Sequence, residues 1–348
     1  MTNRQAAAAL LVLLAAAGCR AERSSADRRA QPGPIRLGYF PNVTHAPAIV
    51  GIRLGLFAAA LGPGVTLESK LFNAGPEAVE ALFSGALDVA YIGPNPAINA
   101  YVQSEGAAIR IIAGATSGGA SLVVRPGIRS AAQLRGTRLA TPQLGNTQDV
   151  ALRAWLMRQG LSATREGGGD VAIVPQPNAQ TLETFRAGQI DGAWVPEPWA
   201  SRLVLEGGGV VLVDERTLWP GGQFVTTQLV VRTEFLRDHA DRVARLLRGH
   251  VRAVEFLNDD PTVARSAVNI GLAALTGRPL EDSVLARAWG NLSFTVDPLA
   301  ASLHQSARAA QQAGLLGEGS LDGIHDLGPL NDVLVMSGRP RVTLQSTP

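Results

Sequence analysis

The sequence predicts an α/β protein built from two lobes, and three observations lead to this prediction. From residue 35 to residue 213, short apolar runs rich in β-branched residues alternate with helical patterns. Strand, helix and strand at this spacing indicate βαβ units and a mostly parallel sheet. From residue 233 to about 313 nearly all of the chain is predicted to be helical. The length of 348 residues is sufficient for two lobes, each with its own core.

The first two regions repeat the same alternation of strands and helices. The predicted strands of the first region are rich in β-branched residues and bounded by Gly, Pro and Asn, as strands usually are. In the first region the predicted strands are 35–39, 65–72, 88–92 and 109–115, and the helices are 46–54, 77–84 and 95–103. In the second region the strands are 138–140, 171–174, 192–195 and 210–213, and the helices are 147–159, 179–187 and 198–206. Ser130 and Gln133 have the spacing of a helix capping box.

The third region is predicted to consist of helices. One apolar stripe with the period of 3.6 residues contains Val243, Leu246, Leu247, Val251, Val254 and Leu257. Pro261 and Pro298 stand where new helices are expected to begin.

Two similar segments, SLVVR at 121–125 and QLVVR at 228–232, flank the middle region. Two such strands suit a hinge that the chain crosses twice. We therefore expect the first part of lobe I at 35–123, lobe II at 124–228 and a helical return to lobe I at 229–340.

The composition excludes several classes of protein. The chain is 46% hydrophobic and 17% charged, which is typical of a soluble globular protein. The formal charge of +2 comes from 31 basic and 29 acidic residues, so the basic excess expected of a nucleic-acid-binding protein is missing. A single cysteine, Cys19, cannot form a disulfide within the chain.

No catalytic or metal-binding motif is present in the sequence. It contains no G-x-S-x-G, G-x-x-x-x-G-K or H-E-x-x-H pattern. Lys70, the only lysine, lies in a predicted strand, which disfavours a Schiff-base role. The five histidines lack metal-ligand spacing, so we expect no metal and no cofactor.

The N-terminus has the pattern of an export signal. Arg4 precedes an apolar run from residue 6 to residue 17, which is too short to cross a bilayer and has the length of a secretory h-region. Small residues before Cys19 resemble a bacterial lipoprotein processing site, although Ala16 stands where Leu is usual. We expect a signal peptide at 1–19 with Cys19 lipidated; the alternative is an ordinary signal and an incidental cysteine. Residues 20–34 are polar and proline-containing, as in a flexible tether.

Six segments at the carboxyl ends of the predicted strands combine Gly or Pro with Asn, Gln, Ser or Thr. They are 41–45, 73–76, 93–95, 116–119, 143–148 and 196–199. In open α/β sheets ligands bind at this end, where helix N-termini offer free N–H groups to an anion. Plain helix capping would select the same residues. The candidate ligand-binding residues include Ser117 and Trp199 from these segments.

Two residues of these segments have a further interpretation. Glu197, between two prolines and next to Trp199, has a carboxylate that would accept an ammonium group of the ligand, while Trp199 supplies an apolar wall. Alternatively, Glu197 is a helix N-terminal residue favoured by the dipole. His45 is expected to form hydrogen bonds in a pocket or to be structural, and not to bind a metal.

Five stretches carry a resemblance to a known family. They are IRLGYF at 35–40, FNAGPEAVEAL at 72–82, LDVAYIGPN at 87–95, LRGTRLATPQLGNTQ at 134–148 and GQIDGAWVPEPW at 188–199. In this order they resemble the nitrate/sulfonate/taurine family of ABC-importer substrate-binding proteins, closest to its aliphatic sulfonate branch. The similarity extends over about residues 35–316.

The resemblance implies a type II periplasmic-binding-protein fold with a double-crossing hinge and a ligand pocket between the lobes. The implied ligand-facing residues are Asn42, His45, Asn73 and Asn95 from lobe I and Asn146, Thr147, Gln148 and Glu197 from lobe II. The implied partners are a small anionic or zwitterionic ligand, an ABC permease and its ATPase. The protein itself is expected to be a monomer that its lipid anchor tethers in the cell envelope. Sulfonates, taurine, nitrate, bicarbonate and pyrimidine precursors all remain candidate ligands.

An enzyme on the same fold is the alternative, because relatives of this architecture include a pyrimidine synthase and a chorismate dehydratase. The synthase would need a pocket lysine and a cysteine cluster, whereas this chain has only Lys70 and Cys19. The sequence therefore favours a binding protein without catalytic activity.

Overall fold

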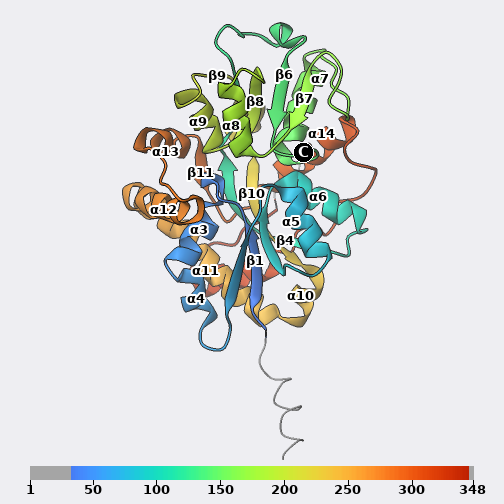
Figure 1. Cartoon of the computed structure of the whole chain (residues 1–348). Helices are drawn as coiled ribbons and strands as arrows, with labels where there is room; N and C mark the ends of the chain where they lie inside the picture. The colour runs from blue at the N-terminus through green and yellow to red at the C-terminus, as the bar shows by residue number, and fades with distance from the viewer. Residues whose placement is uncertain (1–32, 345–348) are drawn as a thin grey trace, which may run out of the picture.

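The strands form two separate sheets, and each sheet is the centre of one lobe (Figure 1). The computed structural model describes residues 33–344. The first sheet, of order β11-β4-β10-β3-β1-β2, contains β1 (Ile35–Tyr39), β2 (Leu67–Leu71), β3 (Val89–Ile92), β4 (Ile109–Gly118), β10 (Val225–Arg232) and β11 (Leu292–Phe294). The second sheet, of order β7-β6-β8-β5-β9, contains β5 (Ala120–Val124), β6 (Arg138–Thr141), β7 (Ala172–Pro175), β8 (Gly192–Pro196) and β9 (Val210–Asp214).

Helices cover both sheets, which confirms the predicted α/β class. Before the second lobe come η2 (Val43–His45), α3 (Ala46–Arg53), α4 (Leu56–Leu61), α5 (Gly75–Phe83) and α6 (Pro94–Gln103). The second lobe contains η3 (Ala131–Leu134), α7 (Thr147–Arg158), α8 (Asn178–Arg186), α9 (Trp199–Leu205), η4 (Glu215–Leu218) and η5 (Pro220–Gly222). The return segment contains α10 (Thr233–Asp238), α11 (Ala240–Asp259), α12 (Pro261–Thr276), α13 (Asp282–Trp289), α14 (Ala300–Gln312) and α15 (Gly328–Met336).

The sheets are mixed, so the prediction of a mostly parallel sheet was wrong. Strand β1 is parallel to β2 and β3, and β6 is parallel to β7 and β8. Strand β10 is antiparallel to β3 and β4, and β5 is antiparallel to β8 and β9. Strands β5 and β10 each enter their sheet directly from the other lobe, whereas β11, which is antiparallel to β4, follows α13. Without a crossover helix, nothing requires β5 and β10 to run parallel to their neighbours.

The chain passes between the lobes twice. Strand β4 ends in the first sheet at Gly118 and β5 begins in the second at Ala120; Gly118 and Gly119 both have positive φ, of 77° and 75°. The return leaves β9 at Asp214 and enters the first sheet at Val225. Residues 120–123 therefore pair in the second sheet and residues 225–228 in the first, which moves both expected boundaries by a few residues toward the N-terminus.

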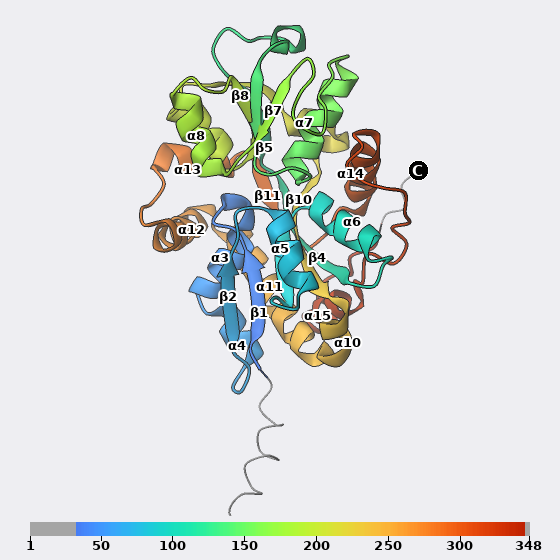
Figure 2. The same ribbon diagram turned by 45° about the vertical axis from the view of Figure 1, so that its right-hand side comes forward.

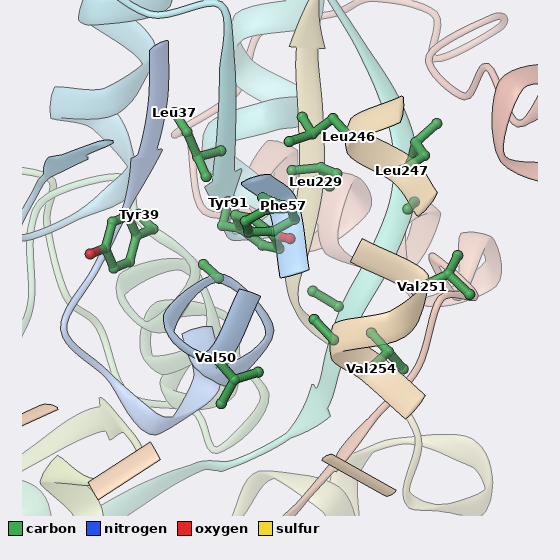
Figure 3. Packing of buried hydrophobic residues seen from close by; sticks show 14 of the residues in the cluster. Leu37, Tyr39, Val50, Phe57, Tyr91, Leu229, Leu246, Leu247, Val251 and Val254 are labelled. Carbon is green, nitrogen blue, oxygen red and sulfur yellow. The ribbon is translucent and has the colours of Figure 1, made fainter. Parts of the chain in front are cut away.

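The predicted apolar stripe of α11 forms one wall of the larger core (Figure 3). All six of its residues are buried, and they pack with Leu37 of β1, Tyr91 of β3 and Leu229 of β10. Phe57 of α4 lies in the same core and is 1% exposed. Helices α3, α4, α12 and α15 pack against α11, so the return segment completes the first lobe.

Two elements of the first lobe were missed from the sequence. Helix α4 and strand β11 are six and three residues long, which is too short for a periodic pattern. The expected start at Pro261 is confirmed, because the Asp260 side chain accepts hydrogen bonds from the N–H groups of Thr262 and Val263. Helix α14 begins at Ala300, two residues after Pro298.

The lobes contact each other on two sides of the crossing strands. Helix α13 packs against α9, and α14 and α6 pack against α7 (Figures 1 and 2). Within residues 33–344, no helix has both the length and the apolar character needed to span a membrane. The expected signal peptide, Cys19 and most of the tether lie outside the described residues.

Candidate functional site

A cavity of about 30 Å³ lies between the lobes, at the carboxyl ends of β1, β3, β6 and β8. This inner cavity is lined by Phe40, Asn42, Thr44, His45, Asn73, Ala74, Gly75, Gly93, Pro96, Pro142, Asn146, Thr147, Gln148, Asn178, Pro196, Thr226 and Thr227. A water molecule needs roughly 10–15 Å³ of such volume, so the inner cavity has room for about two. A larger ligand requires the lobes to separate first.

A second cavity, of about 380 Å³, adjoins the inner one at Asn42, Asn73 and Asn178. This outer cavity is lined by Pro41, Asn42, Asn73, Pro177, Asn178, Ala179, Pro198, Trp199, Arg202, Glu206, Leu272, Thr276, Arg278, Pro279, Leu280 and Glu281. Because they share three lining residues, the two cavities are adjacent, with Asn42, Asn73 and Asn178 at their boundary.

The two cavities differ in charge. The lining of the inner cavity contains no Asp, Glu, Lys or Arg, although it is rich in Asn, Gln, Thr and His. The outer cavity contains both signs of charge. There, Nε of Arg202 lies 2.8 Å from Oε1 of Glu206, and the Arg202 guanidinium lies 4.8 Å from the centre of the Trp199 ring.

The N-terminus of α7 carries three of the expected residues into the inner cavity. Oδ1 of Asn146 caps the helix by accepting the N–H of Asp149 at 2.9 Å, and its Nδ2 donates to Oε1 of Gln148 at 3.1 Å. The first-turn N–H groups of Thr147 and Gln148 have no intrahelical acceptor. Capping and cavity lining, which were alternatives from the sequence, therefore both apply to Asn146.

Asp149 fixes the loop between β6 and α7 by hydrogen bonds. It is fully buried and accepts hydrogen bonds from Oγ1 of Thr141 at 2.9 Å and from the N–H of Gly145 at 3.0 Å. Its Oδ2 also pairs with Nε of Arg153 at 3.0 Å. The buried pair compensates both charges, so that they fix the loop without adding net charge under the cavity.

His45 lines the inner cavity with an uncharged imidazole ring. Burial lowers its pKa to about 3, so the imidazole is uncharged at neutral pH. The N–H of Phe40 donates to Nδ1 of His45 at 3.3 Å. The ring proton is therefore on Nε2, and His45 can act as a hydrogen-bond donor to a ligand.

The structure does not bring Glu197 to either cavity. The residue is 1% exposed, and its carboxylate accepts hydrogen bonds from the N–H and Oγ of Ser201, both at 3.0 Å, and from Nδ2 of Asn291 at 2.7 Å. Burial raises the pKa of Glu197. With its oxygens already occupied by protein donors, it is not available to a ligand ammonium, and the second interpretation from the sequence, a helix N-terminal role, describes it better.

Two other expected residues also have structural partners instead of facing the inner cavity. Nδ2 of Asn95 donates to the carbonyl oxygen of Ser306 at 3.2 Å, and Oγ of Ser117 accepts the N–H of Phe224 at 3.3 Å. Asn42, His45, Asn73, Asn146, Thr147 and Gln148 line the inner cavity, and Trp199 lines the outer one.

Asn178 and Thr227 were missed from the sequence. Asn178 follows β7 after a proline, which is the pattern of the other loops and could have identified it. Thr227 lies within β10, where no loop residue marks it. Among residues 33–344, no group of three or more His, Cys, Asp or Glu side chains is placed to hold a metal ion.

Comparison with known proteins agrees with this architecture. The chain is 29% identical over 243 residues to the taurine-binding periplasmic protein of Escherichia coli K12, covering 69% of this chain and 73% of that protein. It superimposes on the alkanesulfonate-binding protein SsuA from Xanthomonas axonopodis pv. citri bound to MOPS, with a TM-score of 0.69, 23% identity and coverage of 83% and 96%.

The fold is also shared more widely. A Candida albicans protein described as having the generic periplasmic binding protein structural fold matches with a TM-score of 0.63 at 13% identity, over 91% of this chain and 99% of that one. These likenesses confirm the periplasmic-binding-protein fold expected from the sequence. The model of the NMT1-like family matches residues 28–273, and the chain belongs to that family.

Proposed function

We propose that this protein is the extracytoplasmic solute-binding component of an ABC importer, and that it binds a small organic anion between its lobes. The observation that carries the proposal is the chemistry of the inner cavity, which combines hydrogen-bond donors with the absence of charged lining residues. An aliphatic sulfonate or a taurine-like molecule fits this chemistry. The relatives named for taurine and alkanesulfonate support the same class.

The free polar atoms of the cavity are mostly donors. Oδ1 of Asn42 already accepts the Trp199 indole N–H, and Oε1 of Gln148 already accepts from Asn146, so each amide has its N–H₂ group left. His45 adds its Nε2–H, and the first turn of α7 adds backbone N–H groups. An excess of donors over acceptors favours a fully deprotonated oxyanion, and the helix N-terminus stabilises its charge.

Binding is proposed to require opening and closing of the lobes. The inner cavity is too small for a sulfonate to enter while Asn42 and Trp199 remain in contact. The ligand favours closure to the extent that it binds the closed form more tightly than the open form. The closed protein would then deliver the ligand to a permease driven by a cytoplasmic ATPase, with no chemical change to the ligand.

Export and lipid attachment at Cys19 belong to the same proposal, and their support is the sequence pattern at the N-terminus together with the periplasmic relative. Replacing Cys19 by Ala should abolish palmitate labelling and release the exported protein into the soluble fraction. Labelling that persists in the C19A variant would contradict the anchor and leave solute binding untouched.

A thermal-shift screen tests the binding function. The Tm of the protein comprising residues 20–348 is measured with and without methanesulfonate, ethanesulfonate, taurine, nitrate or bicarbonate. The ligand recovered afterwards is analysed by NMR. A ligand specific to the folded state raises stability by about 2.7 kcal/mol at a hundredfold excess over its Kd. We expect a shift with sulfonates and unchanged ligand. A shift only with nitrate or bicarbonate would contradict the sulfonate class, and conversion of the ligand would support an enzyme.

A further inference from the structure

Two of the residues that line the cavities each carry a buried polar side-chain atom without a hydrogen-bond partner in the protein. These atoms are Oγ1 of Thr227, whose residue is 1% exposed, and Oδ1 of Asn178, whose residue is 8% exposed. A buried polar atom without a partner is unfavourable, so each of these atoms is suited to pair with a ligand. Their positions differ: Thr227 lines the inner cavity only, whereas Asn178 lines both cavities.

The two atoms have different hydrogen-bonding capacity. The Thr227 hydroxyl can donate, as the other inner-cavity groups do, and therefore suits the oxyanion. The amide oxygen of Asn178 can only accept. Residue Asn178 lines both cavities, so its side chain lies close to the place where the substituent of a sulfonate bound in the inner cavity would begin.

We propose that Asn178 selects short sulfonates that carry a hydrogen-bond donor, a hydroxyl or an amino group, close to the sulfonate, over those that carry only carbon and hydrogen. This inference rests on the proposed function, because it requires the sulfonate to occupy the inner cavity. Its ligand class is the 2-hydroxy- and 2-aminoalkanesulfonates. Asn178 is the specificity-determining residue and Thr227 is a general contact to the head group.

Oδ1 of Asn178 is an uncharged acceptor, and this affects the selectivity between ligands that carry a hydroxyl group and ligands that carry an ammonium group. No charged residue lines the inner cavity, and the carboxylate of Glu197 is occupied by Ser201 and Asn291. Of the two carboxylates that line the outer cavity, Glu206 is paired with Arg202, and Glu281 is at an exposed position where water screens its charge. An amide oxygen accepts from a hydroxyl and from an ammonium alike, so we expect selection for a donor and little selection between the neutral and the charged donor.

Three ligands of nearly equal size test this: propanesulfonate, 2-hydroxyethanesulfonate and taurine. Titration calorimetry gives their Kd values for the wild-type protein. We expect 2-hydroxyethanesulfonate and taurine to bind about tenfold more tightly than propanesulfonate, because propanesulfonate leaves Oδ1 of Asn178 unpaired. The two donor-bearing ligands are expected to differ by less than that.

Substitutions at Asn178 separate selectivity from general binding. In Asn178→Leu, which removes the acceptor at similar volume, the three Kd values should converge to within about threefold. In Asn178→Asp, which adds charge to the acceptor, taurine should gain over 2-hydroxyethanesulfonate by about tenfold. Gln180→Leu, at an exposed position of the same helix, should leave all three Kd values unchanged. Thr227→Val should weaken all three equally.

The outcomes distinguish this inference from the function on which it rests. Equal binding of all three ligands by the wild-type protein, or an equal loss for all three in Asn178→Leu, overturns the role of Asn178 and leaves sulfonate binding in place. Failure of all three to bind overturns both. Should Asn178→Leu not fold, as judged by circular dichroism and Tm, the shift of preference in Asn178→Asp decides the question alone.

Discussion

The indole Nε1 of Trp199 donates a hydrogen bond to Oδ1 of Asn42 at 2.9 Å, and the two residues belong to different lobes. Trp199 begins α9 in the second lobe, and Asn42 precedes η2 in the first. Both line the outer cavity, and Asn42 also lines the inner one. The bond therefore joins the lobes at the edge of the binding site, and it orients the Asn42 amide so that its N–H₂ group remains for a ligand.

Removing this bond should weaken ligand binding. In Trp199→Phe the ring remains but Oδ1 of Asn42 loses its donor in the closed form. A neutral hydrogen bond contributes about 1 kcal/mol, so Kd for the ligand found in the screen should rise about fivefold by calorimetry. Trp289→Phe, in a ring pair with Phe294 away from both cavities, is the control and should bind normally. Equal losses in both variants would argue against a specific role for the bond.

Glu197 is expected to stabilise the protein without affecting the choice of ligand. In Glu197→Gln the side chain offers one acceptor oxygen in place of two, and its N–H₂ group faces the donors of Ser201 and Asn291. The free energy of unfolding in urea should fall by about 2 kcal/mol. The ratio of the Kd values for taurine and propanesulfonate should stay unchanged. A selective loss of taurine would instead restore Glu197 as the ammonium acceptor.

Gly93 permits the lobes to approach each other. A Cβ atom at this position would clash with Oγ1 of Thr147 across the cleft, while the backbone φ of −72° is acceptable for alanine. Gly93→Ala should therefore disfavour the closed form and raise Kd at least about tenfold, with little change in the Tm of the ligand-free protein. Gly317→Ala, where nothing lies within 4 Å of the new Cβ, is the control.

A double variant identifies the cause of the weaker ligand binding expected for Gly93→Ala. Thr147→Ala removes the clashing oxygen, so Gly93→Ala combined with Thr147→Ala should bind nearly as well as Thr147→Ala alone. If the two substitutions instead weaken binding additively, Gly93 does not act through its contact with Thr147.

Glu215 should make stability depend on pH. It accepts the Trp194 Nε1–H at 2.7 Å, and burial, with a smaller contribution from Asp214, raises its pKa to about 7 from 4.5. Between these two pH values the native state holds a proton that the unfolded state has lost. The free energy of unfolding therefore falls as pH rises through this window, by on the order of 3 kcal/mol.

The Glu215→Gln variant keeps an acceptor for Trp194 but cannot ionise. Urea unfolding at pH 5 and pH 8 should show that the variant loses less stability than the wild type on going to pH 8. The depressed pKa of His45 acts in the opposite direction, because protonation of the unfolded state destabilises the fold below about pH 6.5. Its effect is common to both proteins and cancels in the comparison. Parallel pH profiles would refute the role of Glu215.

The local features of the fold could be predicted because their causes are local. The α11 stripe follows from helical periodicity, and the start of α12 at Pro261 follows from the proline and the Asp260 cap. Short elements such as β11 have no such pattern, and the antiparallel direction of β5 and β10 depends on which sheet each strand enters after a crossing. Six of the ten expected ligand-binding residues line the inner cavity, because the carboxyl ends of the strands converge there.

What the sequence by itself determined is which of the longer segments become strands and helices and which loops follow the carboxyl ends of the strands, since periodicity and capping act over short distances along the chain. Only the tertiary structure decided which loop side chains remain free for a ligand. The Glu197 carboxylate accepts a hydrogen bond from Asn291, which is 94 residues away in the sequence. The Trp199 indole donates a hydrogen bond to Asn42, which is 157 residues away. Oγ1 of Thr227 and Oδ1 of Asn178 have no hydrogen-bond partner in the protein. A hydrogen bond consumes the capacity of both partners, and which partners meet depends on how the two lobes pack.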